Sequence, residues 1–223
     1  MRDFPFQIVG FDLDGTLLDT HGDLGAAVNH ALSLAGRPPV PIASVTGLIG
    51  GGAKKMLARA MDMTGGLPDA GFDELYAELL AYYEANIAVH TRPYPGTVTM
   101  LEGLAQRGVA LAVVTNKMER YARKLLGELG LTPHFFTIIG GDTLGPGKAK
   151  PAPDQILAMI AQSPKPGRAA YVGDTTYDTR AALAAHIPSI AVAFGFNDLP
   201  AADLGATAVI HHYDDLIPTL QTL

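Results

Sequence analysis

Six short runs of apolar residues are spread along the chain, and each is nearly continuous rather than alternating with polar residues. Runs of this kind, bounded by polar or turn residues, are typical of strands buried on both faces of a sheet. We therefore predict strands at residues 8–11, 109–114, 135–139, 169–172, 189–193 and 208–210.

Between most of these runs the apolar residues recur at the spacing of a helix that buries one face. This spacing predicts helices at residues 97–107, 118–129, 154–161, 178–186 and 214–220. Gly108 and Gly130 follow two of these segments, where glycine commonly ends a helix. Alternating strands and helices are typical of right-handed βαβ crossovers. The expected fold class is α/β, with a doubly wound, Rossmann-like parallel sheet.

The stretch from residue 17 to residue 91 interrupts this alternation, because it offers helical patterns at 24–34, 53–61 and 72–88 but no convincing strand. Pro93 and Pro95 end the stretch, since each proline biases the preceding residue away from helix. We predict an α-helical cap at 17–91, inserted after the first strand, and a core made of 1–16 and 92–223. Helices that simply cover one face of the sheet are the alternative.

Composition narrows the class of protein further. The chain has 223 residues, of which 48% are apolar and 17% charged, so we expect it to fold around a hydrophobic core. Its net charge of −6 argues against general binding to nucleic acid or anionic membranes and favours a small-molecule partner. Without cysteine, any metal must be held by oxygen or imidazole ligands. No apolar run suits a signal or membrane segment, so we expect a cytoplasmic protein.

Carboxylates and hydrogen-bonding side chains follow the predicted strands where ligands bind in open parallel sheets. They are Asp12, Asp14, Thr115, Asn116, Asp174 and Asp178. For any single position a polar turn is a sufficient explanation. Four carboxylates brought together, however, would repel one another unless a cation neutralised them. Oxygen ligands of this kind suit Mg²⁺, so a magnesium site is expected at this edge.

Two other phosphate or metal motifs are excluded by their spacing. The sequence from Asp12 is not a calcium-binding EF-hand, because Thr16 and Leu17 stand where an oxygen ligand and a glycine are required. The glycines before Lys148 do not form a P-loop, since Asp142 and Ala149 replace its first glycine and its metal-binding hydroxyl.

Four short segments occur in a fixed order: FDLDGT at 11–16, VTNK at 114–117, KPAP at 150–153 and GDTTYD at 173–178. Together they resemble the four motifs of the haloacid dehalogenase superfamily, over about residues 8 to 195. With the helical insertion after the first motif, the pattern is similar to the phosphoglycolate phosphatase branch. The resemblance implies a Mg²⁺-dependent phosphatase acting on a small phosphorylated metabolite.

The resemblance also implies roles for individual residues. Asp12 is expected to attack phosphorus and form an aspartyl-phosphate, while Asp14 serves as acid and then base. Thr115, Asn116 and Lys150 are expected to bind the phosphoryl group. Lys150 is favoured over Lys148 because only Lys150 precedes Pro-x-Pro. The expected metal residues are Asp12, Asp14 through its backbone carbonyl, Asp174 and, in an orienting role, Asp178.

The cap is expected to select the substrate. Gly51, Gly52 and Lys54, at a predicted helix start, could bind a second anionic group, although a solvated helix face explains them equally well. The first substrate to test is 2-phosphoglycolate. The alternatives are a sugar phosphomutase, a pyrophosphatase, a nucleotidase or a non-catalytic binding module, and the protein is expected to be a monomer or homodimer. His186 is interpreted as an ordinary residue at a helix C-terminus.

Overall fold

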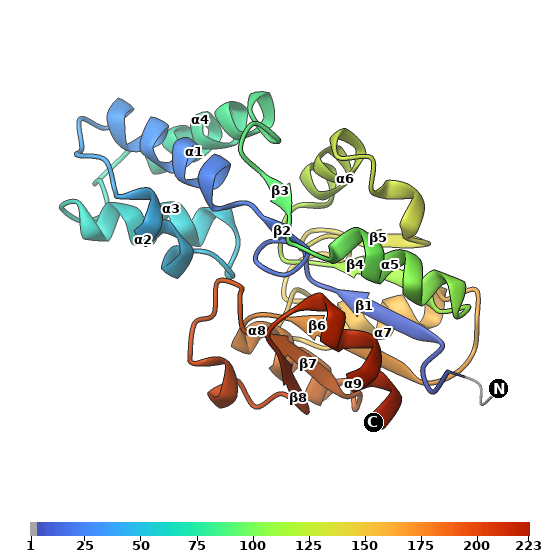
Figure 1. The fold of residues 1–223 in the computed structure, drawn as a ribbon. Coiled ribbons are helices and arrows are strands. Elements are labelled where there is room, and N and C mark those ends of the chain that lie inside the picture. The colour runs from blue at the N-terminus through green and yellow to red at the C-terminus, as the bar shows by residue number, and fades with distance from the viewer. Residues whose placement is uncertain (1–3) are drawn as a thin grey trace.

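A six-stranded parallel sheet forms the centre of the computed structural model, which describes residues 4–223 (Figure 1). Its strands are β1 (Ile8–Phe11), β4 (Ala110–Val114), β5 (Thr137–Ile139), β6 (Ala169–Gly173), β7 (Ser189–Val192) and β8 (Ala208–Ile210). They lie in the order β5-β4-β1-β6-β7-β8, and every pair is parallel. The predicted α/β fold class and all six predicted strands are confirmed.

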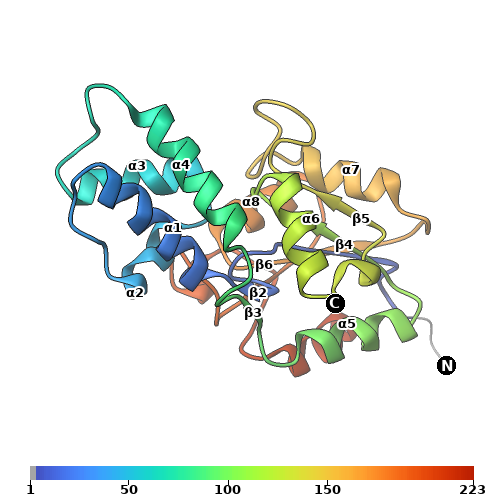
Figure 2. The same ribbon diagram turned by 90° about the horizontal axis from the view of Figure 1, so that it is seen from above.

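Helices cover both faces of this sheet (Figure 2). They are α5 (Thr97–Gln106), α6 (Glu119–Glu128), α7 (Asp154–Gln162), α8 (Thr176–Ala184) and α9 (Leu216–Thr222). Helix α8 begins two residues before the predicted start, because Thr175 and Asp178 cap its first turn reciprocally. A short 3₁₀ turn at Tyr213–Asp215 precedes α9, so the helix predicted at 214–220 starts later than expected. Within residues 4–223, no helix is both long enough and apolar enough to span a membrane.

Alternate residues of β1 face opposite layers of the core. Val9 and Phe11 belong to the larger apolar cluster, and Ile8 belongs to the smaller cluster beneath α7 and α8. Gly10 points toward α7, where a Cβ atom would lie 2.4 Å from the sulfur of Met159. Glycine is therefore needed at this position for the close approach of helix and strand.

The helices of the segment predicted to form a cap lie to one side of the sheet (Figure 1). They are α1 (His21–Leu34), α2 (Ile42–Val45), the 3₁₀ turn η1 (Thr46–Leu48), α3 (Ala53–Met63) and α4 (Phe72–Ala85). The segments 42–45 and 46–48 were not predicted, because one helical turn carries no measurable periodicity. Helix α4 ends at Ala85 rather than 88, since the Asn86 amide donates to the carbonyl of Tyr82 and caps the helix.

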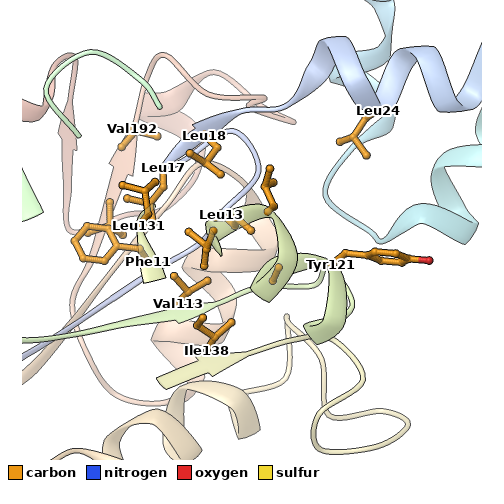
Figure 3. Packing of buried hydrophobic residues seen from close by; sticks show 14 of the residues in the cluster. Phe11, Leu13, Leu17, Leu18, Leu24, Val113, Tyr121, Leu131, Ile138 and Val192 are labelled. Atoms are coloured by element: carbon orange, nitrogen blue, oxygen red, sulfur yellow. The ribbon is translucent and has the colours of Figure 1, made fainter. Parts of the chain in front are cut away.

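The apolar interior is continuous from core to cap. Leu13, Leu17 and Leu18 gather with Phe11 of the sheet, while Leu24 extends from α1 on the cap side (Figure 3). All of these side chains belong to one cluster of buried residues. The cap is therefore packed against the core through shared hydrophobic contacts as well as through the connecting chain.

Two short strands carry the chain between core and cap. Strand β2 (Leu18–Asp19) pairs antiparallel with β3 (Arg92–Pro93), so the outgoing and returning segments lie side by side. Sequence analysis missed this pair, because two residues and a proline give no strand pattern. The cap boundaries at 16–17 and 91–92 fall beside the pair, and they stay predictions.

A buried carboxylate fixes the returning segment next to this pair. Asp23 of α1 is 2% exposed and accepts hydrogen bonds from the backbone N–H groups of His90 and Thr91 and from the Thr91 hydroxyl, at distances of 2.7 to 3.1 Å. These charge-assisted bonds tie the first cap helix to the end of the cap.

Replacing Asp23 by Ala should lower the free energy of unfolding by about 2 to 5 kcal/mol, because the buried N–H and hydroxyl of Thr91 lose their acceptor. Urea denaturation of the purified protein measures this loss. Asp69→Ala, at an exposed loop position, should change the stability by less than about 0.5 kcal/mol. Equal stabilities for the two variants would contradict the role given to Asp23.

His186 lies one residue beyond the C-cap of α8 and adopts a left-handed conformation with φ of 58°. The His186 N–H donates to Leu183 and the Ile187 N–H to Ala182, which is the Schellman pattern usually completed by glycine. The helix predicted at 178–186 therefore ends before His186, which lies at the helix C-terminus as interpreted and serves there as a strained cap.

His186→Gly should raise the free energy of unfolding by up to about 1 kcal/mol, because glycine relieves the strain at positive φ. His186→Ala removes the same imidazole but keeps the strain, so it should bring no gain. Denaturation midpoints of the two variants test this directly, and a stabilised alanine variant would show that the imidazole itself is unfavourable.

Candidate active site

The candidate site lies where the strand order reverses. Counting only strands of the main sheet, their spatial order is 3-2-1-4-5-6, and β1 and β6 are the neighbours from which the chain winds in opposite directions. Ligands bind at such a point in open α/β sheets. Asp12 follows β1 directly and Asp174 follows β6, so the two carboxylates start from adjacent strand ends.

Three buried carboxylates meet here, from Asp12, Asp174 and Asp178. Each offers one oxygen, and these oxygens lie within 4.8 Å of one another. Burial, with repulsion from Asp178 and Asp14, raises the pKa of Asp12 to about 6, although Lys150 opposes the rise. Burial and the same kind of repulsion raise the pKa of Asp174 well above its usual range. Burial and mutual repulsion thus disfavour the ionised carboxylates, and a divalent cation would offset both effects.

Lys150 is the buried cation of this cluster. Its ammonium donates to Asp178 Oδ1 at 2.6 Å and to the Tyr171 hydroxyl at 2.8 Å, and it lies 2.9 Å from Asp12 Oδ1. Burial alone would lower the pKa of Lys150, but the two carboxylates raise it above its ordinary value. Lys148, the competing lysine, pairs instead with Asp154 in an exposed position.

The three carboxylates differ in how far their oxygens are already engaged. Asp178 accepts from Lys150 through Oδ1 and from the N–H and hydroxyl of Thr175 through Oδ2. Asp174 accepts from the Thr16 hydroxyl at 3.0 Å and from the Phe196 N–H at 2.7 Å. The buried Oδ1 of Asp12 has no hydrogen-bond partner among the described residues, although Lys150 is close. Asp12 and Asp174 are therefore better placed than Asp178 to hold a metal ion.

A tight turn after β1 permits this arrangement. Gly15 has φ of 81°, and a Cβ atom there would lie 2.2 Å from Asp174 Oδ2. Any other residue would therefore be strained and would displace the carboxylate. The turn keeps Asp14 beside the cluster, since Gly15 donates to the Leu18 carbonyl and closes the loop.

Thr115 and Asn116 follow β4 at the same edge. The Thr115 oxygen accepts the Lys117 N–H, and its own hydroxyl proton has no acceptor within residues 4–223. The Asn116 amide nitrogen donates to the carbonyls of Lys150 and of Gly50 in the cap, whereas its buried oxygen has no partner in the described structure. Asn116 thus joins two parts of the site.

Gln155 is a positioning residue that sequence analysis missed. Its amide nitrogen donates to the carbonyls of Thr115 and Gly140, and its oxygen accepts the Lys150 N–H. One side chain therefore links the backbones that follow β4 and β5 to the segment carrying Lys150. The signal available was a polar residue on the apolar face of a predicted helix.

Asp14 is paired with a second lysine. Lys117 Nζ lies 2.8 and 2.9 Å from the two oxygens of Asp14, and the side chains are 6% and 12% exposed. Burial would lower the pKa of Lys117, but Asp14 and Tyr83 raise it above its ordinary value. Lys117 belongs to the VTNK motif, but its role was not predicted, because sequence does not tell which carboxylate a lysine reaches.

A cavity of about 580 Å³ lies between the core and the cap. The core lines it with Asp12, Asp14, Thr115, Asn116 and Lys150, and the cap with Gly51, Gly52 and Lys54. The predicted phosphoryl and cap residues thus share one cavity, while Asp174 and Asp178 do not line it. Lys54 is exposed and pairs with Asp73 at 2.6 Å, near the rings of Phe72 and Tyr76.

Comparison with known proteins identifies the class. The family model of haloacid dehalogenase-like hydrolases matches residues 9–192, and the chain belongs to this family. Over 212 residues it is 42% identical to a phosphoglycolate phosphatase of Agrobacterium fabrum (strain C58), covering 94% of this chain and 90% of that protein. A phosphoglycolate phosphatase of Caulobacter vibrioides is 36% identical, covering 100% of this chain and 94% of the other.

A solved structure gives the same likeness in three dimensions. It is the crystal structure of a predicted phosphoglycolate phosphatase from Haemophilus somnus 129pt, with a TM-score of 0.89 and 29% sequence identity. The match covers 97% of this chain and 99% of that one. The resemblance inferred from the four motifs is confirmed.

Asp174→Asn should weaken binding of a divalent ion by about tenfold or more, because one anionic ligand is lost from the cluster. Titration calorimetry with MgCl₂ and with MnCl₂ measures the affinity without catalysis. Asp154→Asn removes a carboxylate outside the cluster and should leave the affinity unchanged. Unchanged affinity in the Asp174 variant would mean that the ion binds elsewhere.

Proposed function

We propose that the protein is a Mg²⁺-dependent phosphatase that hydrolyses a small phosphomonoester, with 2-phosphoglycolate as the first candidate. The observation that carries the proposal is Asp12 at the floor of the cavity, with an oxygen free of hydrogen bonds beside a buried lysine. The relatives named phosphoglycolate phosphatase, which align with nearly the whole chain, support the choice of substrate.

In the proposed reaction, Asp12 attacks phosphorus and the ester bond to the leaving oxygen breaks, which gives an aspartyl-phosphate. Asp14 protonates the leaving oxygen and then takes a proton from the water that hydrolyses the aspartyl-phosphate, releasing phosphate and regenerating Asp12. Lys150 and the Thr115 hydroxyl donate to the phosphoryl oxygens as charge develops on them. Asn116 binds on the same side, next to Lys150.

Mg²⁺ would be held by the Asp12 carboxylate, the Asp14 backbone carbonyl and the Asp174 carboxylate. When bound, the ion supplies positive charge to the transferring phosphoryl group. Asp178, whose oxygens already accept from Lys150 and Thr175, orients the lysine rather than binding the metal. The donor set consists of carboxylate and carbonyl oxygens, the ligands that Mg²⁺ prefers.

The cap residues Gly51, Gly52 and Lys54 are proposed to face the part of the substrate remote from phosphorus, and all three line the cavity. A monomeric or homodimeric state and a cytoplasmic location stay predictions from the sequence. The core would accept any phosphomonoester, so selectivity must come from the cavity wall.

Asp12→Asn should reduce phosphate release by about a thousandfold or more while the protein stays folded, because the amide is a poor nucleophile of nearly the same shape. Phosphate release is measured for 2-phosphoglycolate, p-nitrophenyl phosphate, pyrophosphate, a sugar phosphate and a nucleoside monophosphate, with and without Mg²⁺. Thermal melts check the fold, and Asp69→Asn serves as the control.

Activity of the Asp12 variant within tenfold of the unsubstituted protein would end the covalent mechanism. A preference for another substrate in the panel would keep the mechanism and replace 2-phosphoglycolate. No phosphate release from any substrate would favour the binding-module alternative.

A further inference from the structure

The pair of Lys117 and Asp14 has a spare hydrogen-bond donor that the phosphoryl chemistry does not use. An ammonium has three N–H donors, and Asp14 occupies two of them with its two oxygens. Lys117 lines the cavity, whereas Lys150 already supplies positive charge at Asp12. The remaining N–H of Lys117, which lies beside the Tyr83 side chain, can therefore donate to a group bound next to Asp14.

Tyr83 provides a second unused donor at the same place, and it comes from the cap. Its side chain lines the cavity and is 3% exposed, and its buried hydroxyl has no hydrogen-bond partner among residues 4–223. Lys117 Nζ lies 4.7 Å from the centre of its ring. Burial raises the pKa of Tyr83 to about 12, so the hydroxyl keeps its proton. A buried hydroxyl without a partner carries a cost that a bound acceptor would remove.

The chemistry of the substrate places its second charge next to these donors. Asp14 must come within about 3 Å of the leaving oxygen to transfer a proton. In 2-phosphoglycolate a single methylene separates that oxygen from the carboxylate. The carboxylate must therefore lie close to Asp14, and the cation closest to Asp14 is Lys117, at 2.8 Å. Lys54, by comparison, is exposed and already paired with Asp73.

Resting on the proposed function, we propose that Lys117 and Tyr83 form the subsite for a substrate carboxylate one carbon removed from the ester oxygen. The core supplies the charge through Lys117, and the cap supplies the hydroxyl through Tyr83. Four lysines and three aspartates line the cavity, so its lining has a net positive formal charge that favours a substrate carboxylate. The substrate class is that of 2-(phosphooxy)carboxylates.

Lys148 offers a matched control for Lys117, since it also pairs with an aspartate but does not line the cavity. Lys117→Met and Lys148→Met keep the aliphatic stem and remove the charge. Each is assayed with 2-phosphoglycolate and with its amide, phosphoglycolamide, which has nearly the same shape but no carboxylate. The readout is the ratio of kcat/KM for the two substrates.

Lys117→Met should lower this ratio by about 10- to 100-fold, mainly through KM for 2-phosphoglycolate, because a charge-assisted contact is lost. Tyr83→Phe should lower it by about three- to tenfold, since one neutral donor is lost. Lys148→Met should change it by less than about threefold. Equal losses for both substrates in the Lys117 variant, or a change of the ratio as large in the Lys148 variant, would overturn the proposal.

Binding without chemistry separates this subsite from the catalytic proposal. Titration calorimetry compares 3-phosphonopropanoate, in which a methylene replaces the ester oxygen of phosphoglycolate, with propylphosphonate, which lacks the carboxylate. The unsubstituted protein should bind the carboxylated phosphonate more tightly, and Lys117→Met should abolish that preference. A preference that survives in Lys117→Met, or none in the unsubstituted protein, would overturn the subsite. Failure of the enzyme to hydrolyse 2-phosphoglycolate while it turns over another phosphomonoester would instead refute the proposed substrate.

Discussion

The buried ammonium of Lys150 is the charge on which the arrangement of the sheet edge depends. Asp12 follows β1, and Asp178 lies in the first turn of α8. Without a cation between them, their buried carboxylates would repel each other. Lys150 is held there by Tyr171 and, through its backbone, by Gln155. The parallel sheet brings these groups together, and the lysine makes their proximity tolerable.

Core and cap contribute unequally to the cavity that results. The core supplies nearly all the groups able to act on phosphorus, from Asp12 and Thr115 at strand ends to Lys150 in the loop before α7. The cap supplies the opposite wall of the cavity. The Asn116 side chain of the core donates to the Gly50 carbonyl of the cap, and Asp23 holds the end of the cap at Thr91. Because the residues that act on phosphorus and the cap residues that line the cavity belong to different segments, the reaction can stay the same while the shape of the cavity changes.

Sequence alone predicted the sheet and the position of the carboxylates, because strands buried on both faces leave continuous apolar runs and the polar residues that follow them share one edge. It missed β2 and β3, since two-residue strands have no period. It also missed the pairing of Lys117 with Asp14 and the unpartnered hydroxyl of Tyr83. Both depend on how the cap packs over the core, and several tyrosines of α4 look alike before that packing is known.

The pairing of β2 with β3 makes it easy for the segment between these strands to change during evolution. Adjacent strands run about 5 Å apart, so removal of everything between them would leave two ends that a tight turn could rejoin. An inserted segment of this kind can be lengthened, exchanged or deleted without a change in the strand order of the main sheet. The part of the cavity wall that the cap contributes, Tyr83 included, and the residues that act on phosphorus are thus encoded in separable stretches of the gene, which allows one to be inherited unchanged while the other diverges.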